Sequence, residues 1–184
     1  MTTKSRRRGR ALEPVLLRAA PSPVPPALRR AYRDTAYHVT LRGGAARHVA
    51  AFVLRVGRAA PEVALAFPRR RCWALLTAWN PQSARRALND NRRAQSRLRA
   101  ALRQGGWRFF TGENRADPIF DPGTGAGRRV WPPEASLFVP GLPLAAAVAL
   151  ARRFRQKAIL ADCRSCRTAR AMFLAGAWNF APVI

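Results

Sequence analysis

The chain has 184 residues, enough for one folded domain with a hydrophobic core and a tail. Its 48% hydrophobic content is typical of a globular chain, and its longest apolar run, residues 142–151, is about half of the roughly 20 residues that a transmembrane helix needs. The 34 lysine and arginine residues against 9 acids give a formal net charge of +25, which favours polyanionic partners: RNA, DNA or an anionic membrane surface.

Three cysteines, Cys72, Cys163 and Cys166, are too few and too unevenly spaced for the disulfide scaffold of a small secreted protein. The amino terminus carries charges but no following apolar block of the signal-peptide type. We therefore expect a cytoplasmic protein without a transmembrane segment.

Residues 1–30 are predicted to form a basic, proline-rich, disordered arm. Basic residues cluster near its start, and a later group of prolines interrupts both helix and strand. Two interpretations stay open: an arm that follows the phosphates of a nucleic acid, and a solvated leader without a partner. A single α+β domain is expected over residues 31–175, followed by a C-terminal tail over residues 176–184.

A buried strand followed by an amphipathic helix is the clearest unit of the sequence. Residues 72–79 form a largely apolar run. The strand is expected to end before Pro81, because proline has no backbone N–H to donate to a neighbouring strand. Ser83 is expected to cap the next helix. That helix is predicted over residues 84–103, because its apolar positions recur at a spacing of three and four residues.

The remaining elements are also predicted from periodicity and from turn residues. They are strands over residues 32–41, 107–111, 135–139 and 157–163, a helix over residues 144–154, and a candidate C-terminal strand over residues 167–174. From residue 73 the order is that of a ferredoxin-like α+β domain, a split β-α-β-β-α-β core, with an extra N-terminal strand. Helices cover one face of such a sheet, so we expect the other face to be free to bind a ligand.

Four segments carry a resemblance to a known family: residues 77–83 (TAWNPQS), 91–93 (NRR), 131–136 (WPPEAS) and 149–159 (ALARRFRQKAI). In their order and spacing they resemble a family of uncharacterised bacterial proteins, the domain of unknown function 3293 family. The resemblance covers about residues 31–173. It implies a small cytoplasmic bacterial α/β protein, and it implies no particular activity.

The corner after the buried strand is a candidate ligand site, formed by Trp79, Asn80, Ser83, Asn91 and Glu134. Open α/β sheets often bind ligands at the carboxyl ends of strands, and a helix start exposes N–H groups. Asn91 falls within the apolar stripe of its helix, so its side chain must be paired. Two interpretations stay open: Asn91 ties the helix to the backbone near Asn80, or it contacts a ligand of a small-molecule-binding or enzymatic domain.

Arginine clusters are the stronger functional signal. The helix of residues 84–103 is expected to carry arginines opposite its apolar stripe, and further clusters precede the buried strand and end the second helix. The predicted phosphate contacts are Arg69, Arg70, Arg71, Arg85, Arg86, Arg92, Arg93, Arg97, Arg99, Arg103, Arg152 and Arg153. No DNA-binding motif is present, so RNA or a ribonucleoprotein is preferred over DNA. An acidic protein partner and a merely solvated basic surface are the alternatives.

The sequence predicts no catalytic residue, no cofactor and no metal, which favours a protein that is not an enzyme. His38 and His48 are the only histidines, and no serine or cysteine lies in a recognisable nucleophile motif. Cys163 and Cys166 form a C-x-x-C pair, but that is half of a zinc site and no second half has ligand spacing.

Overall fold

The computed structural model describes residues 26–41, 49–116, 132–162, 170–174 and 180–182. One curled sheet of eight strands, in the order β2-β1-β4-β5-β3-β6-β7-β8, forms the centre of the molecule, and every neighbouring pair is antiparallel. The strands are β1 (Thr35–Thr40), β2 (Ala51–Leu54), β3 (Trp73–Leu76), β4 (Phe110–Ala116), β5 (Glu134–Pro140), β6 (Ala158–Asp162), β7 (Arg170–Leu174) and β8 (Phe180–Pro182). The helices are α1 (Pro26–Arg33), α2 (Pro61–Ala66), the short 3-10 helix η1 (Pro81–Ser83), α3 (Leu88–Gln104) and α4 (Leu144–Arg153). The chain is thus an α+β protein.

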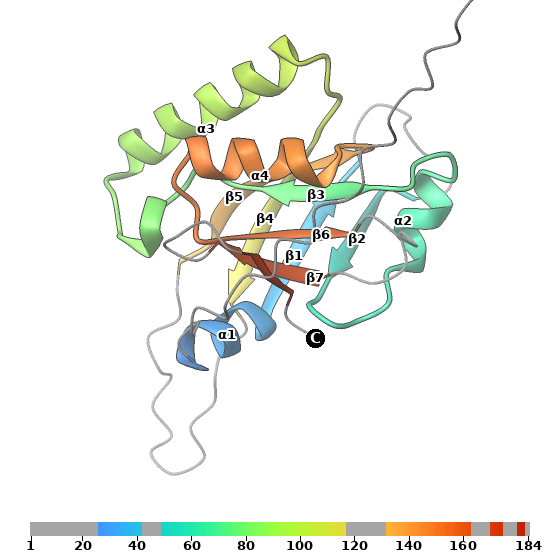
Figure 1. Ribbon diagram of the computed structural model, residues 1–184, viewed down its shortest axis with the longest axis horizontal. Helices are drawn as coiled ribbons and strands as arrows, with labels where there is room; N and C mark the ends of the chain where they lie inside the picture. The colour runs from blue at the N-terminus through green and yellow to red at the C-terminus, as the bar shows by residue number, and fades with distance from the viewer. Residues whose placement is uncertain (1–25, 42–48, 117–131, 163–169, 175–179, 183–184) are drawn as a thin grey trace, which may run out of the picture.

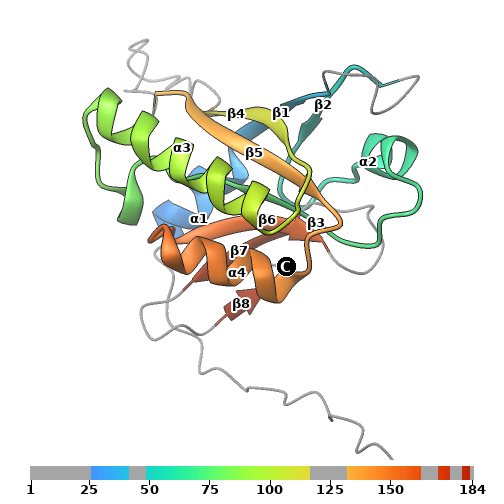
Figure 2. The same cartoon turned by 90° about the horizontal axis from the view of Figure 1, so that it is seen from above.

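Each face of the sheet carries its own hydrophobic core, because side chains of a strand alternate between the two faces. In β3, Ala74 and Leu76 belong to the core under α3 and α4. Trp73 and Leu75 belong to the other core, with β1, β2 and α2. The helices α3 and α4 lie on the same face of the sheet in both views (Figures 1 and 2).

The prediction of a free sheet face is wrong, because that face is filled by apolar side chains. Phe138 of β5 is 0% exposed and its ring lies 5.2 Å from that of Phe52 in β2. Three strand spacings separate β2 from β5 in the sheet order, which in a flat sheet would be about 14 Å. The sheet therefore curls on itself, and Phe67 and Trp73 complete the aromatic cluster around Phe138.

Helix α1 begins inside the stretch that was predicted to be a disordered arm. Pro26 is its first residue, where a missing N–H costs nothing because that group has no partner within the helix. The helix ends against β1, and the Thr35 hydroxyl donates a hydrogen bond to the Ala31 carbonyl oxygen over 2.7 Å. Residues 1–25 of the predicted arm lie outside the described residues.

Several predicted boundaries also shift. Helix α3 begins at Leu88 instead of residue 84, and its N-cap is Ala87, without a side-chain cap. Strand β4 begins at Phe110 and extends to Ala116, into a stretch predicted to be a loop. The candidate C-terminal strand is present as β7, and β8 pairs with it within the predicted tail.

Candidate functional site

The corner between β3 and α3 has an unusual backbone. Asn80, Gln82 and Ser83 have φ values of 44°, 58° and 55°, in the left-handed region that residues other than glycine rarely adopt. Asparagine tolerates this region better than most residues. A residue other than glycine in this conformation costs about 1–3 kcal/mol, which interactions with its surroundings must offset. The side chains around the corner must therefore stabilise this conformation.

A reciprocal pair of asparagines provides part of that stabilisation. The Asn80 backbone N–H donates to Asn91 Oδ1 over 2.9 Å, and Asn91 Nδ2 donates to Asn80 Oδ1 over 3.0 Å. Both residues are buried. The Arg86 backbone N–H also donates to Asn80 Oδ1 over 3.0 Å, which fixes the segment before α3 to Asn80. The prediction that Asn91 ties its helix to the Asn80 corner is confirmed.

Glu134 connects the same corner to β5. Asn80 Nδ2 donates to Glu134 Oε1 over 2.6 Å. Burial, and secondly the negative charge of Glu134, raise the pKa of the Tyr32 phenol above its usual value. The pKa of Tyr37 is raised as well, chiefly by burial, and its hydroxyl donates to the Tyr32 carbonyl oxygen over 3.1 Å. Glu134 therefore links the corner to β5, and its charge acts on the tyrosine of α1.

Two buried glutamines, which sequence reasoning missed, complete the corner. Gln95 Oε1 accepts the Ala78 backbone N–H over 2.9 Å, and Gln156 Nε2 donates to the Trp79 carbonyl oxygen over 3.0 Å. They satisfy backbone groups that lose their ladder partners where β3 ends. Gln95 lies one turn after Asn91 on the buried face of α3, so the periodicity that identified Asn91 could also have identified Gln95.

The corner also holds the end of α4. The Gln82 backbone N–H donates to the Arg155 carbonyl oxygen over 2.8 Å, and Gln156 follows directly. Ser83 does not begin a helix, because the chain is extended at Ala84 and α3 starts four residues later. The exposed helix N–H groups expected beside Ser83 are therefore absent there, and the corner joins the start of α3 to the end of α4.

Helices α3 and α4, with the segment just before α3, form the helical layer of the molecule. The predicted arginines of this layer occupy two kinds of position. Arg85 and Arg86 lie before α3 and are exposed. On α3 and at the end of α4 the exposed arginines are Arg92, Arg93, Arg97, Arg103 and Arg153. Arg99 and Arg152 are partly covered, so the prediction that all the arginines of α3 share the exposed half is wrong for Arg99.

This surface contains few acids. Between residues 81 and 112 the only acid is Asp90, which pairs with Arg93 through an Nη2–Oδ1 distance of 2.5 Å. Residues 135–161, which include α4, contain none. The two sequence segments that build α3 and α4 therefore supply a single acid between them.

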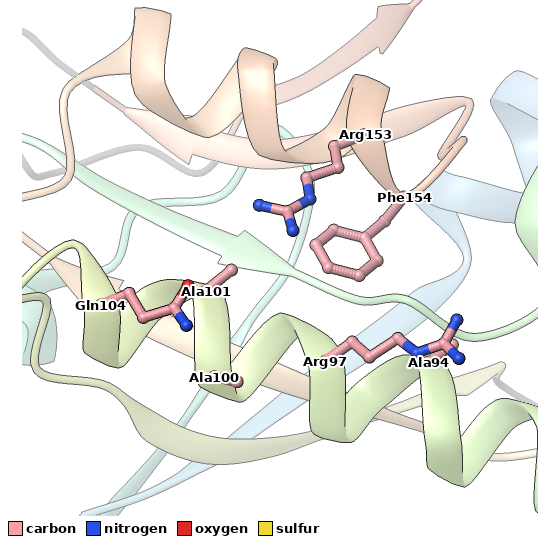
Figure 3. A pocket seen from close by; sticks show the side chains of 7 residues that line it. All are labelled: Ala94, Arg97, Ala100, Ala101, Gln104, Arg153 and Phe154. Atoms are coloured by element: carbon pink, nitrogen blue, oxygen red, sulfur yellow. The ribbon is translucent and has the colours of Figure 1, made fainter.

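A groove between α3 and α4 is lined by two arginines, Arg97 and Arg153, that are far apart in the sequence (Figure 3). Its volume is about 380 Å³. Arg153 and Phe154 project from the end of α4 toward α3, where Arg97 lies among small side chains (Figure 3). The complete lining is Ala94, Arg97, Ala100, Ala101, Gln104, Arg153 and Phe154.

The triplet of Arg69, Arg70 and Arg71 lies apart from this groove. It is exposed between α2 and β3, and the Arg70 side chain approaches Gly141 at the turn before α4. The groove instead lies at the C-terminal end of α4. An α-helix of ten residues is about 15 Å long, so the triplet and Arg153 lie at opposite ends of α4.

The remaining predicted features concern the cysteines and histidines. Cys163, Cys166 and His48 lie outside the described residues, whereas His38 lies on β1 opposite Glu113 of β4. In the described part of the chain, no three His, Cys, Asp or Glu side chains come together as a metal site would require. Nor does any helix in that part have the length and apolar character to cross a membrane.

Comparison with known proteins assigns a family to the central part of the chain. Residues 76–159 match the family described as "Protein of unknown function (DUF3293)", so the predicted family is confirmed over this range. The match begins in β3 and ends in β6, and it includes the corner and all residues of the groove. No curated protein and no solved structure matches the chain.

Proposed function

We propose that this chain, which carries the DUF3293 domain, binds nucleic acid through phosphate contacts from the arginines of its helical layer. RNA or a ribonucleoprotein is preferred over DNA, since the sequence has no DNA-binding motif. The observation that carries the proposal is that Arg97 and Arg153 line the same groove, between two helices whose sequence segments have almost no acids.

The chemistry of arginine suits this role. A guanidinium stays charged at physiological pH and can donate two parallel hydrogen bonds to a phosphate. Arg97 and Arg153 are exposed, so a phosphate can reach them without desolvating a buried ion. The corner stabilises their arrangement, because its hydrogen bonds hold the start of α3 next to the end of α4.

The proposal is tested by titrating the purified full chain with single-stranded RNA across a salt series. The affinity should fall steeply with salt, with a logarithmic slope of about −0.7 for each phosphate that the protein neutralises. The double variant Arg97→Ala, Arg153→Ala should bind more weakly and lose about 1.4 from the magnitude of that slope, since two phosphate contacts disappear.

A matched control separates local contacts from net charge. The double variant Arg33→Ala, Arg58→Ala removes the same charge from two exposed arginines outside the helical layer. It should bind nearly as well as the unchanged chain. Equal losses in both double variants would mean that overall charge, and not this surface, governs binding. No binding of RNA or DNA at low salt would refute the proposal.

The corner supports a second candidate, a small-molecule-binding or enzymatic site around Asn80, Ser83 and Glu134. The supporting observation is the cluster of three left-handed residues other than glycine, because such conformations concentrate at functional sites. The polar atoms of Asn80 and Asn91 already make internal hydrogen bonds, which favours a structural role. A thermal shift with a metabolite, reduced by Ser83→Gly, would favour this candidate over nucleic acid.

An acidic protein partner is a third candidate, and it would use the same arginines. It would be identified if an acidic polypeptide displaced the partner from the protein and RNA did not.

The strand order β4-β5-β3-β6, with α3 and α4 on one face, supports a ferredoxin-like split core with added edge strands. The small number and uneven spacing of the cysteines support a cytoplasmic location.

A further inference from the structure

We infer that the groove between α3 and α4 holds an unpaired base of a single-stranded nucleic acid, with the base on the ring of Phe154 and the flanking phosphates on Arg97 and Arg153. This inference rests on the proposed function and adds the form of nucleic acid that the site accepts. It also separates two contributions to affinity: phosphate contacts, which any polyanion can make, and base stacking, which requires a free base.

The lining of the groove combines a small-residue wall with an aromatic side chain. Ala94, Ala100 and Ala101 leave space because their side chains are short. Phe154 is half-buried and packs against the core beneath the helices, so its ring is held in place. The volume of about 380 Å³ falls within the roughly 300–1,000 Å³ of ligand pockets.

The charge of the groove selects an anionic ligand with a flat part. The guanidinium carbon of Arg153 lies 5.8 Å from the centre of the Phe154 ring, which places a cation directly beside the aromatic surface. Arg97 supplies a second cation, and no carboxylate is among the lining residues. Gln104 adds an amide that can donate to or accept from a base edge. A nucleotide has this combination of ring and phosphate.

The fold favours a single strand over a duplex at this place. In a duplex the base faces are stacked on one another, whereas an unpaired base can be splayed onto an aromatic side chain. RNA-recognition modules stack bases on an open sheet face, but here the corresponding face is filled by Trp73, Phe138 and their neighbours. Within the described residues, Phe154 is the aromatic side chain that lines the groove between the arginine-bearing helices.

The first test uses the unchanged full chain and three ligands: a short oligouridylate, an abasic oligomer with the same number of phosphates, and a duplex of equal length. The single strand should bind about five- to 100-fold more tightly than the abasic oligomer, since stacking of a base contributes a factor of this size. It should also bind more tightly than the duplex, although the duplex has the higher charge density.

The second test uses Phe154→Leu, which keeps an apolar side chain but removes the aromatic face. Its affinity for oligouridylate should fall to that for the abasic oligomer, and its affinity for the abasic oligomer should not change. Phe109→Leu is the matched control, because Phe109 is also half-buried and has Arg103 at 5.6 Å from its ring centre, but does not line the groove. It should leave both affinities unchanged.

The outcomes separate this inference from the proposed function. Equal binding of the single strand and the abasic oligomer by the unchanged chain would overturn base recognition and leave phosphate binding intact. Binding of neither ligand at low salt would overturn both. Tighter binding to an acidic polypeptide or to anionic vesicles than to oligouridylate would also overturn the inference. If Phe154→Leu fails to fold, the abasic comparison still decides the question.

Discussion

Asn91→Ala is the substitution that most directly tests how the corner is held together. Asn91 is 3% exposed and forms hydrogen bonds with the backbone N–H and with Oδ1 of Asn80, over 2.9 and 3.0 Å. The substitution removes both and leaves the Asn80 N–H buried without its partner. Each hydrogen bond contributes about 1 kcal/mol, and an unsatisfied buried donor costs about 1–3 kcal/mol. We expect a loss of about 2–4 kcal/mol in the free energy of unfolding.

The assay is equilibrium unfolding in urea, followed by circular dichroism, with linear extrapolation to zero denaturant. Asn89→Ala is the control, because Asn89 is exposed on the same helix. Both substitutions gain helix propensity of about 0.5 kcal/mol, so the difference between the two variants isolates the corner. If Asn91→Ala costs no more than about 0.5 kcal/mol relative to Asn89→Ala, the hydrogen bonds of Asn91 do not stabilise the corner.

Two further predictions concern the sheet and its tyrosines. Gly112→Ala should destabilise the fold by about 1–3 kcal/mol in the same urea assay, since the added Cβ would lie 2.7 Å from Ser136 Oγ and 2.8 Å from the His38 carbonyl oxygen. An unchanged free energy of unfolding would show that β1 and β5 can move away from β4 at little cost. The raised pKa values of Tyr32 and Tyr37 mean that the folded state keeps protons that the unfolded state releases, so stability should fall as the pH rises above about 10. Because these are the only two tyrosines, phenolate absorbance should appear only with unfolding; titration of the native chain near pH 10 would contradict this.

The buried corner and the basic surface act together in this interpretation. Asn91 and Gln95 hold the end of β3 from the side of α3, and Gln156 holds it from the end of α4. The same contacts therefore fix the positions of the two helix segments that carry Arg97 and Arg153. A substitution in the corner should consequently weaken nucleic-acid binding even though no corner side chain lines the groove.

The sequence by itself determined the features that depend on local periodicity and composition. The apolar run at residues 72–79 predicts a buried strand, which the structure contains as the shorter β3, and the spacing in α3 puts Asn91 on a buried face, where it must be paired. The excess of arginine over acids predicts a basic surface whatever the fold. These inferences succeed because neighbours along the chain decide them.

Only the tertiary structure decided what depends on residues that are distant along the chain. The curl of the sheet fills the face that was expected to be free, because Phe52 of β2 reaches Phe138 of β5. Helix α3 starts at Leu88 because Asn80, with Asn91 and Arg86, holds the preceding segment extended. The groove exists because α3 and α4 lie side by side on the sheet, which no local pattern in either helix specifies.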